Sequence, residues 1–151
     1  MSKLIFVMVM LLGWVGAAHA DVFAVTSGKD RLALTCQGAG VTDTSCSIAM
    51  GQGSPGEAMP VRFTTKPTRY AHLLKVGIEK AVESKRPSFP LDARDISLLR
   101  GLALDKCHPG ADESADLFQL CMPGGSSSSV VLFARGACDR CDFEPYVLRK
   151  R

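Results

Sequence analysis

Six cysteines are the residues of this chain with the clearest chemistry, and all of them follow an apolar N-terminal segment. They are Cys36, Cys46, Cys107, Cys121, Cys138 and Cys141. Six cysteines permit fifteen pairings, and the sequence alone does not choose among them. Proximity along the chain favours Cys36 with Cys46 and Cys107 with Cys121, which leaves Cys138 with Cys141. We expect these bonds to be structural.

Cys138 and Cys141 have the spacing of dithiols that exchange disulfides when one thiolate is stabilised. A helix N-terminus usually provides that stabilisation. Here an expected strand precedes the pair and Asp142-Phe143-Glu144-Pro145 follows it, which predicts a hairpin turn. Neighbouring aspartates also oppose thiolate formation, whereas Arg140 favours it. We predict a structural turn disulfide here, and a thiol-disulfide oxidoreductase is the alternative.

Two other kinds of chemistry find less support. Cys107 and His108 together with Cys138 and Cys141 would form a ligand set that zinc accepts, but exported thiols are normally oxidised. The sequence has no Gly-x-Ser-x-Gly, no His-Glu-x-x-His and no glycine loop for phosphate. We therefore expect no metal or cofactor, and a non-enzyme is favoured over an enzyme.

The segment that precedes the cysteines indicates the compartment in which they are found. Lys3 precedes an apolar run over residues 4–15, and Ala18-His19-Ala20 is the small-x-small pattern that signal peptidases cleave. We predict a cleaved signal peptide over residues 1–20, and a single exported domain over 21–151. The apolar run is shorter than the ~18 residues that span a bilayer, so no membrane span is expected after cleavage. The expected location is periplasmic or secreted.

The charge of the mature chain argues against nucleic acid as a partner. Removing Lys3 from the 18 basic residues leaves 17 against 15 acidic residues, a formal net charge of +2. Nucleic-acid-binding domains usually carry a clustered basic face and a much higher pI. Two of the three histidines remain after cleavage, His72 and His108. We expect His72 to be a half-buried helix residue.

The strongest periodic pattern lies in the middle of the chain. Apolar residues recur at steps of three and four from Tyr70 to Val82, and Leu73, Leu74 and Ile78 lie on this stripe. The pattern predicts an amphipathic helix that begins at Thr68 and ends at Ser84. Asp92 and Asp95 have the spacing of a capping box and predict a second short helix that ends near Gly101. We expect the stripe to face the protein core.

Alternating segments on both sides of these helices predict strands. They cover residues 31–36, 45–50, 59–64, 102–107, 116–122, 130–135 and 143–149. The expected fold class is therefore α+β: a small disulfide-stapled antiparallel sheet packed against one main amphipathic helix and a short second helix.

Two segments of the chain resemble each other. The segments 32–36 and 117–121 both begin with Leu, end with Cys and are followed four residues later by Gly. Shared hairpin chemistry explains this better than duplication.

The function expected from these features is non-catalytic binding. Long loops held by disulfides are suitable recognition surfaces, as in exported inhibitors and envelope-accessory proteins. The partner would be an unknown protein or envelope component.

Overall fold

The computed structural model describes residues 20–37, 41–52, 57–84, 89–124, 128–138 and 140–151. Residues 1–19 lie outside this set, so the signal peptide and its cleavage before Asp21 stay predictions. Asp21 itself lies in a strand, where Lys150 forms an ion pair with its carboxylate over 3.5 Å. Among the described residues, no helix is long and apolar enough to cross a membrane.

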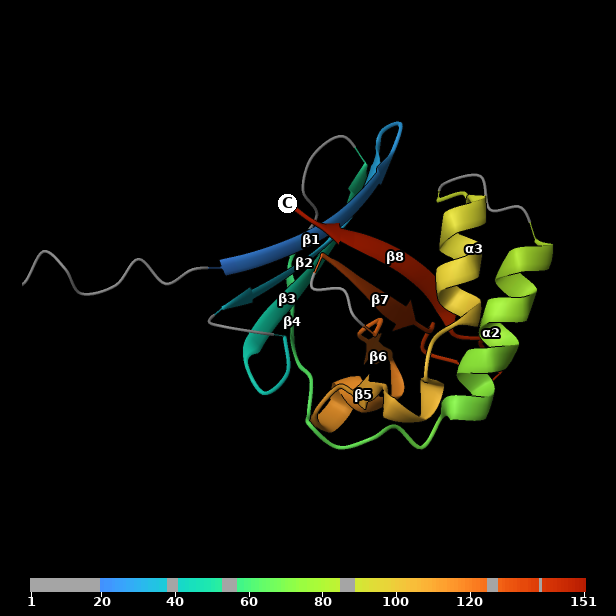
Figure 1. Ribbon diagram of the computed structural model, residues 1–151. Helices are drawn as coiled ribbons and strands as arrows, with labels where there is room; N and C mark the ends of the chain where they lie inside the picture. The colour runs from blue at the N-terminus through green and yellow to red at the C-terminus, as the bar shows by residue number, and fades with distance from the viewer. Residues whose placement is uncertain (1–19, 38–40, 53–56, 85–88, 125–127, 139) are drawn as a thin grey trace, which may run out of the picture.

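Eight strands form one antiparallel sheet in the order β4-β3-β2-β1-β8-β7-β6-β5 (Figure 1). They are β1 (Ala20–Ser27), β2 (Asp30–Gln37), β3 (Ser45–Gln52), β4 (Met59–Arg62), β5 (His108–Pro109), β6 (Phe118–Cys121), β7 (Ser129–Ala134) and β8 (Glu144–Lys150). The sheet consists of two four-stranded meanders, which meet where β1 pairs with β8. Sequence analysis did not predict β1. In the turn after β1, Gly28 has a φ of 60°, which suits a two-residue hairpin connection.

The two outer strands of the sheet are brought together by backbone hydrogen bonds. Phe63, just after β4, forms a bridge with Gly110, just after β5. The amide of Thr64 donates to the carbonyl of Pro109 over 3.0 Å, and that of Ala111 donates to the carbonyl of Arg62 over 2.6 Å. We call residues 62–64 and 109–111 the seam. Because the seam joins the edges, the sheet curves strongly and encloses part of its own hydrophobic core.

Two separate cores follow from this curvature. The inner core lies within the curve and includes Leu34, Phe63, Leu132 and Leu148. The outer core lies between the helices and the opposite face of the sheet, where Val131 packs near the helical residues. Strand β7 is buried on both faces because its successive side chains alternate between the two cores.

Two helices supply the other side of the outer core. Helix α2 (Ala71–Glu83) buries Leu74, Gly77, Ile78 and Ala81, and α3 (Ala93–Arg100) buries Leu99. Figure 1 shows both helices beside the start of β8, away from β2 and β3. Strand β8 contacts α2 directly.

The predicted fold class is therefore wrong in its proportions. The sheet is a large, mostly self-covering half-barrel with two short helices, and it is not a small sheet that depends on one main helix. The predicted helix from Thr68 to Ser84 corresponds to α2, but its Leu73 is 43% exposed. The physical reason is the curvature: the inner face is buried by the sheet itself, so α2 needs to cover only the outer face of one meander.

The capping box of α3 is present as predicted. The Asp92 side chain accepts a hydrogen bond from the amide of Asp95, and the Asp95 side chain accepts one from the amide of Asp92. In contrast, the strand predicted over 102–107 is wrong. The amides of Lys106 and Cys107 donate to carbonyls three residues earlier, so Leu104–Lys106 forms a 3-10 turn (η2).

The two similar segments occupy β2 and β6, the second strand of each meander. Their cysteines nevertheless face opposite sides of the sheet. Cys36 belongs to the inner core, whereas Cys121 belongs to the outer core. Since a shift of one residue reverses every side chain of a strand, the matching letters do not mark matching positions.

Candidate functional site

The structure joins the cysteines in the three pairs that are nearest along the chain. The bond between Cys36 and Cys46 links β2 to β3 within the inner core. The bond between Cys107 and Cys121 lies in the outer core. All four of these residues are at most 5% exposed, so solvent reagents do not reach them in the folded state.

The third disulfide differs because it lies at the surface. Cys138 is exposed and Cys141 is half-buried. Both lie in the connection between β7 and β8, whose ends pair through Ala134 and Glu144. A Cβ atom on Gly136 would lie 3.1 Å from the Cys141 sulfur, so this glycine leaves the space that the disulfide occupies.

This hairpin setting agrees with the expected context of the Cys-x-x-Cys pair. The described residues after Cys141 lead directly into β8, and no helix starts there. The pair therefore lacks the helix N-terminus that stabilises a catalytic thiolate in many oxidoreductases. Whether the pair is redox-active stays a prediction.

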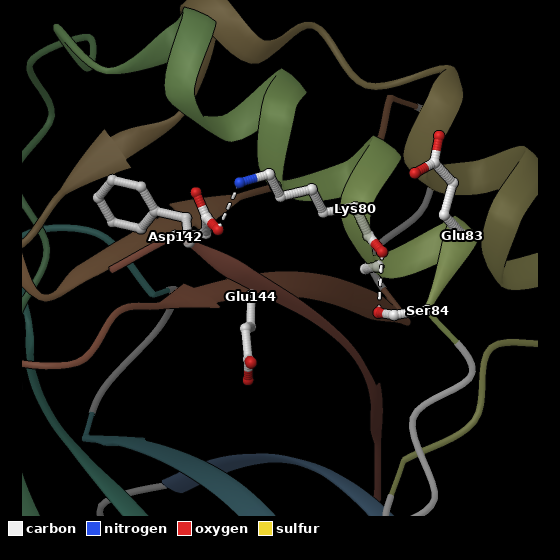
Figure 2. A pocket seen from close by; sticks show the side chains of 8 residues that line it. Lys80, Glu83, Ser84, Asp142 and Glu144 are labelled. Atoms are coloured by element: carbon white, nitrogen blue, oxygen red, sulfur yellow. Dashed lines mark hydrogen bonds and ion pairs between the residues drawn. The ribbon is translucent and has the colours of Figure 1, made fainter. Parts of the chain in front are cut away.

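A cleft of about 490 Å³ lies beside the segment that follows the third disulfide (Figure 2). One wall is the C-terminal half of α2, and the other is the start of β8 with the two residues before it. The lining residues are Gly77, Lys80, Ala81, Glu83, Ser84, Asp142, Phe143 and Glu144. We call this the α2–β8 cleft.

One ion pair bridges the two walls of the α2–β8 cleft. The Lys80 ammonium lies 2.8 Å from a carboxylate oxygen of Asp142, and Figure 2 shows the two side chains reaching toward each other. Both side chains are substantially exposed, at 59% and 44%. An exposed pair of this kind stabilises the fold little, but it links the two walls of the cleft.

Two further polar side chains of the cleft, Ser84 and Glu144, form hydrogen bonds with nearby groups. The hydroxyl of Ser84 donates to the Lys80 carbonyl over 2.8 Å, which closes the end of α2. The carboxylate of Glu144 accepts a hydrogen bond from the Tyr146 hydroxyl over 2.7 Å. Glu83 and Glu144 thus add two carboxylates to a cleft in which Lys80 is already paired with Asp142.

Phe143 anchors the β8 wall of the cleft. Its side chain is 1% exposed, and its backbone lies against Gly77, where a Cβ atom would come too close to the Phe143 carbonyl. The Arg135 guanidinium lies 4.8 Å from the centre of the Phe143 ring, and the Tyr70 ring centre lies 5.7 Å away. Cation–π and aromatic contacts therefore hold both ends of the β7–β8 connection together.

A polar cluster continues from Tyr70 toward Asp116. The Tyr70 hydroxyl donates to the Asp116 carboxylate, and the Arg69 guanidinium donates to both groups over 2.9 and 3.3 Å. The hydrogen bond from Tyr70 and the nearby Arg69 charge lower the pKa of Asp116. The hydrogen bonds that Arg69 donates to Tyr70 and Asp116 raise the pKa of Arg69. These contacts tie the start of α2 to the end of η3 (Asp112–Asp116).

The structure does not bring the considered zinc ligands together as thiols. Cys107 is bonded to Cys121, and Cys138 to Cys141. Within the described ranges, no group of three His, Cys, Asp or Glu side chains is arranged to hold a metal ion. His72 is exposed rather than half-buried, and His108 lies at the short strand β5.

Sequence analysis did not find the pairs that build the cleft and the neighbouring polar cluster. Lys80 and Asp142 of the cleft are separated by 62 residues, and Tyr70 and Asp116 of the polar cluster by 46. A single sequence holds no signal for such distant pairs. Only Cys138 and Cys141 were identifiable, because their chemistry depends on local spacing.

Comparisons of this chain with protein-family models, with curated proteins and with solved structures found no match. The site must therefore be interpreted from its own geometry.

Proposed function

We propose that this protein is a non-catalytic exported binding protein that holds a partner in the α2–β8 cleft. The observation that carries the proposal is the cleft itself, since its walls come from a helix and a strand that both pack on the outer core. A site on rigid elements binds without first being ordered, which lowers the entropic cost of association. The partner is a protein or envelope component.

The chemistry of the cleft favours a partner with a basic side chain. Ala81, which is 8% exposed, and the buried Gly77 and Phe143 form an apolar floor, and the carboxylates of Glu83 and Glu144 are additional to the Lys80–Asp142 pair. A lysine or arginine combines an apolar stem with a cationic head and so matches both features. Such a contact would weaken as salt concentration rises.

A blocking substitution tests the proposal. Ser84 is exposed and lines the cleft, so Ser84→Tyr should obstruct it, while Ser97→Tyr places the same side chain on the exposed face of α3. Mature protein is immobilised and exposed to an envelope extract, and captured proteins are identified by mass spectrometry. The wild type and Ser97→Tyr should retain the same partner, and Ser84→Tyr should lose it. Equal capture by both variants, or no capture by the wild type, would contradict the proposal.

A thiol-disulfide oxidoreductase is the second candidate, favoured by the exposure of Cys138. Its test is the reduction of insulin by the wild-type protein. Activity that disappears in the Cys138→Ser/Cys141→Ser variant would support catalysis. We expect no such activity because no helix N-terminus stabilises a thiolate at this pair. A reduction potential well below about −300 mV would identify a structural bond.

A further inference from the structure

We infer that the Cys138–Cys141 disulfide is a redox switch for the α2–β8 cleft: an external dithiol reduces this bond selectively, and reduction loosens the β8 wall. The inference concerns the protein as the substrate of a reductant, which differs from catalysis by the pair. Only the consequence for partner binding rests on the proposed function; the reduction of the bond and the loosening of the wall do not.

Selectivity follows from the contrast among the three disulfides. A thiolate must approach a sulfur atom directly in order to exchange with it. Cys36, Cys46, Cys107 and Cys121 are at most 5% exposed and lie within the two cores. Cys138 is exposed, so a dithiol can reach this bond without unfolding the protein.

The exchange can be written as a balanced pair of steps. A thiolate of the dithiol attacks the sulfur of Cys138, and Cys141 leaves as a thiolate that takes up a proton. The second thiol of the reductant then attacks the mixed disulfide and releases Cys138 as a thiol. Two electrons pass to the protein, and the dithiol becomes a disulfide.

The wall of the cleft is coupled to this bond by chain continuity. Asp142 follows Cys141 directly, and its carboxylate forms the ion pair with Lys80 across the cleft. The disulfide is a covalent restraint on Cys141, in the space that Gly136 leaves open beside its sulfur. Breaking the bond removes this restraint, and the exposed ion pair with Lys80 then restrains the Asp142 side chain only weakly.

The buried Phe143, which follows Asp142, limits how far the loosening spreads along β8. Phe143 is 1% exposed and lies between the Arg135 guanidinium and helix α2. Reduction should consequently release Cys141 and Asp142 while Phe143 stays in the outer core. The expected effect is a local opening of the cleft mouth rather than unfolding.

Selective reduction is tested with dithiothreitol as the dithiol. The oxidised mature protein is titrated with dithiothreitol under native conditions, and free thiols are alkylated and located by peptide mapping. Cys138 and Cys141 should be modified at a concentration at least about tenfold lower than the other four cysteines. Simultaneous modification of all six would overturn the inference.

Opening of the cleft is tested by hydrogen exchange on the selectively reduced protein. Amides of residues 80–84 and 140–142 should exchange at least about tenfold faster than in the oxidised protein, while those of β2 and β3 stay unchanged. The Cys138→Ser/Cys141→Ser variant should show the faster exchange without any reductant. Unchanged exchange at the cleft after reduction would overturn the switch. Both measurements use the protein alone, so they are independent of whether the oxidised form captures a partner.

Discussion

Gly77 determines how closely α2 approaches β8, since its missing side chain leaves room for the Phe143 carbonyl. The same residue lines the α2–β8 cleft, where the proposed binding site lies. A residue that is normally unfavourable within a helix is thus tolerated because of packing. Its effect can be tested directly.

Gly77→Ala should destabilise the protein by about 1–3 kcal/mol, because the added methyl group overpacks the contact with Phe143. Gly101→Ala is the matched control, since a Cβ atom there lies 3.5 Å from its nearest neighbour and the φ of −89° suits alanine. The control should be neutral or slightly stabilising. Urea denaturation of both variants measures the difference, and equal effects would show that α2 does not approach Phe143 closely.

The lowered pKa of Asp116 predicts how the stability of the protein depends on pH. Because its pKa is lowered in the folded state, it contributes stability above its ordinary value, and this contribution is lost as the pH falls through the lowered pKa. Asp116→Asn should therefore flatten the loss of stability below about pH 4. Denaturation at several acidic pH values measures the slope. Tyr70→Phe removes the hydroxyl that contributes most to lowering the pKa of Asp116, so it should also flatten the dependence of stability on pH. If both variants lose stability with falling pH as the wild type does, Asp116 is not the source of that loss.

At the scale of elements, two of the disulfides should stabilise the fold to different degrees. The Cys107–Cys121 bond spans 14 residues and lies within the outer core, whereas the Cys138–Cys141 bond spans three. A larger ring restricts the unfolded chain more. The two bonds should thus differ in their effect on stability.

Replacing Cys107 and Cys121 with Ala should cost about 3 kcal/mol through the unfolded chain, plus a cavity term, because the pair is buried. Replacing Cys138 and Cys141 with Ala should cost about 2 kcal/mol or less by the same relation. Thermal unfolding of the two double variants ranks the bonds. A larger loss for the surface pair would contradict this assignment of roles.

How well the elements could be predicted depended on how local their signals are. The stripe of α2 and the capping box at Asp92 act over a few residues, and both helices lie where they were expected. The seam joins Phe63 to Gly110, and the cleft joins Lys80 to Asp142. These contacts depend on the path of the whole chain, so neither the closure of the sheet nor the cleft could be predicted from local patterns.

At the scale of the whole molecule, the seam decides whether the inner core is closed. Phe63 is fully buried there, and the backbone on both sides of it hydrogen bonds across to residues 109–111. An open sheet would expose these groups to water. The seam therefore joins the two meanders at their outer edges, in addition to the pairing of β1 with β8.

Phe63→Ala should cost about 3–5 kcal/mol, because it leaves a cavity in the inner core next to the seam. Met59→Ala on the same outer strand is the control; Met59 is 48% exposed, so its removal should change stability by no more than about 0.5 kcal/mol. In the wild type, the amides of Thr64 and Ala111 should exchange as slowly as those of the central strands. Rapid exchange at both amides would show that the edges are not joined in solution.

The pairing of β1 with β8 also sets an order of events during folding. Strands β1 to β4 can assemble from neighbouring segments of the chain. The other edge of β1 stays unpaired until β8 forms beside it, where Phe23 pairs with Lys150 near the C-terminus. Contacts between such distant segments form slowly, and an unpaired strand edge can bind another chain in the meantime. A nascent polypeptide that ends before β8 would leave the edge of β1 unpaired and able to bind another chain. Correct folding during biogenesis therefore depends on how quickly β8 is synthesised and pairs with β1.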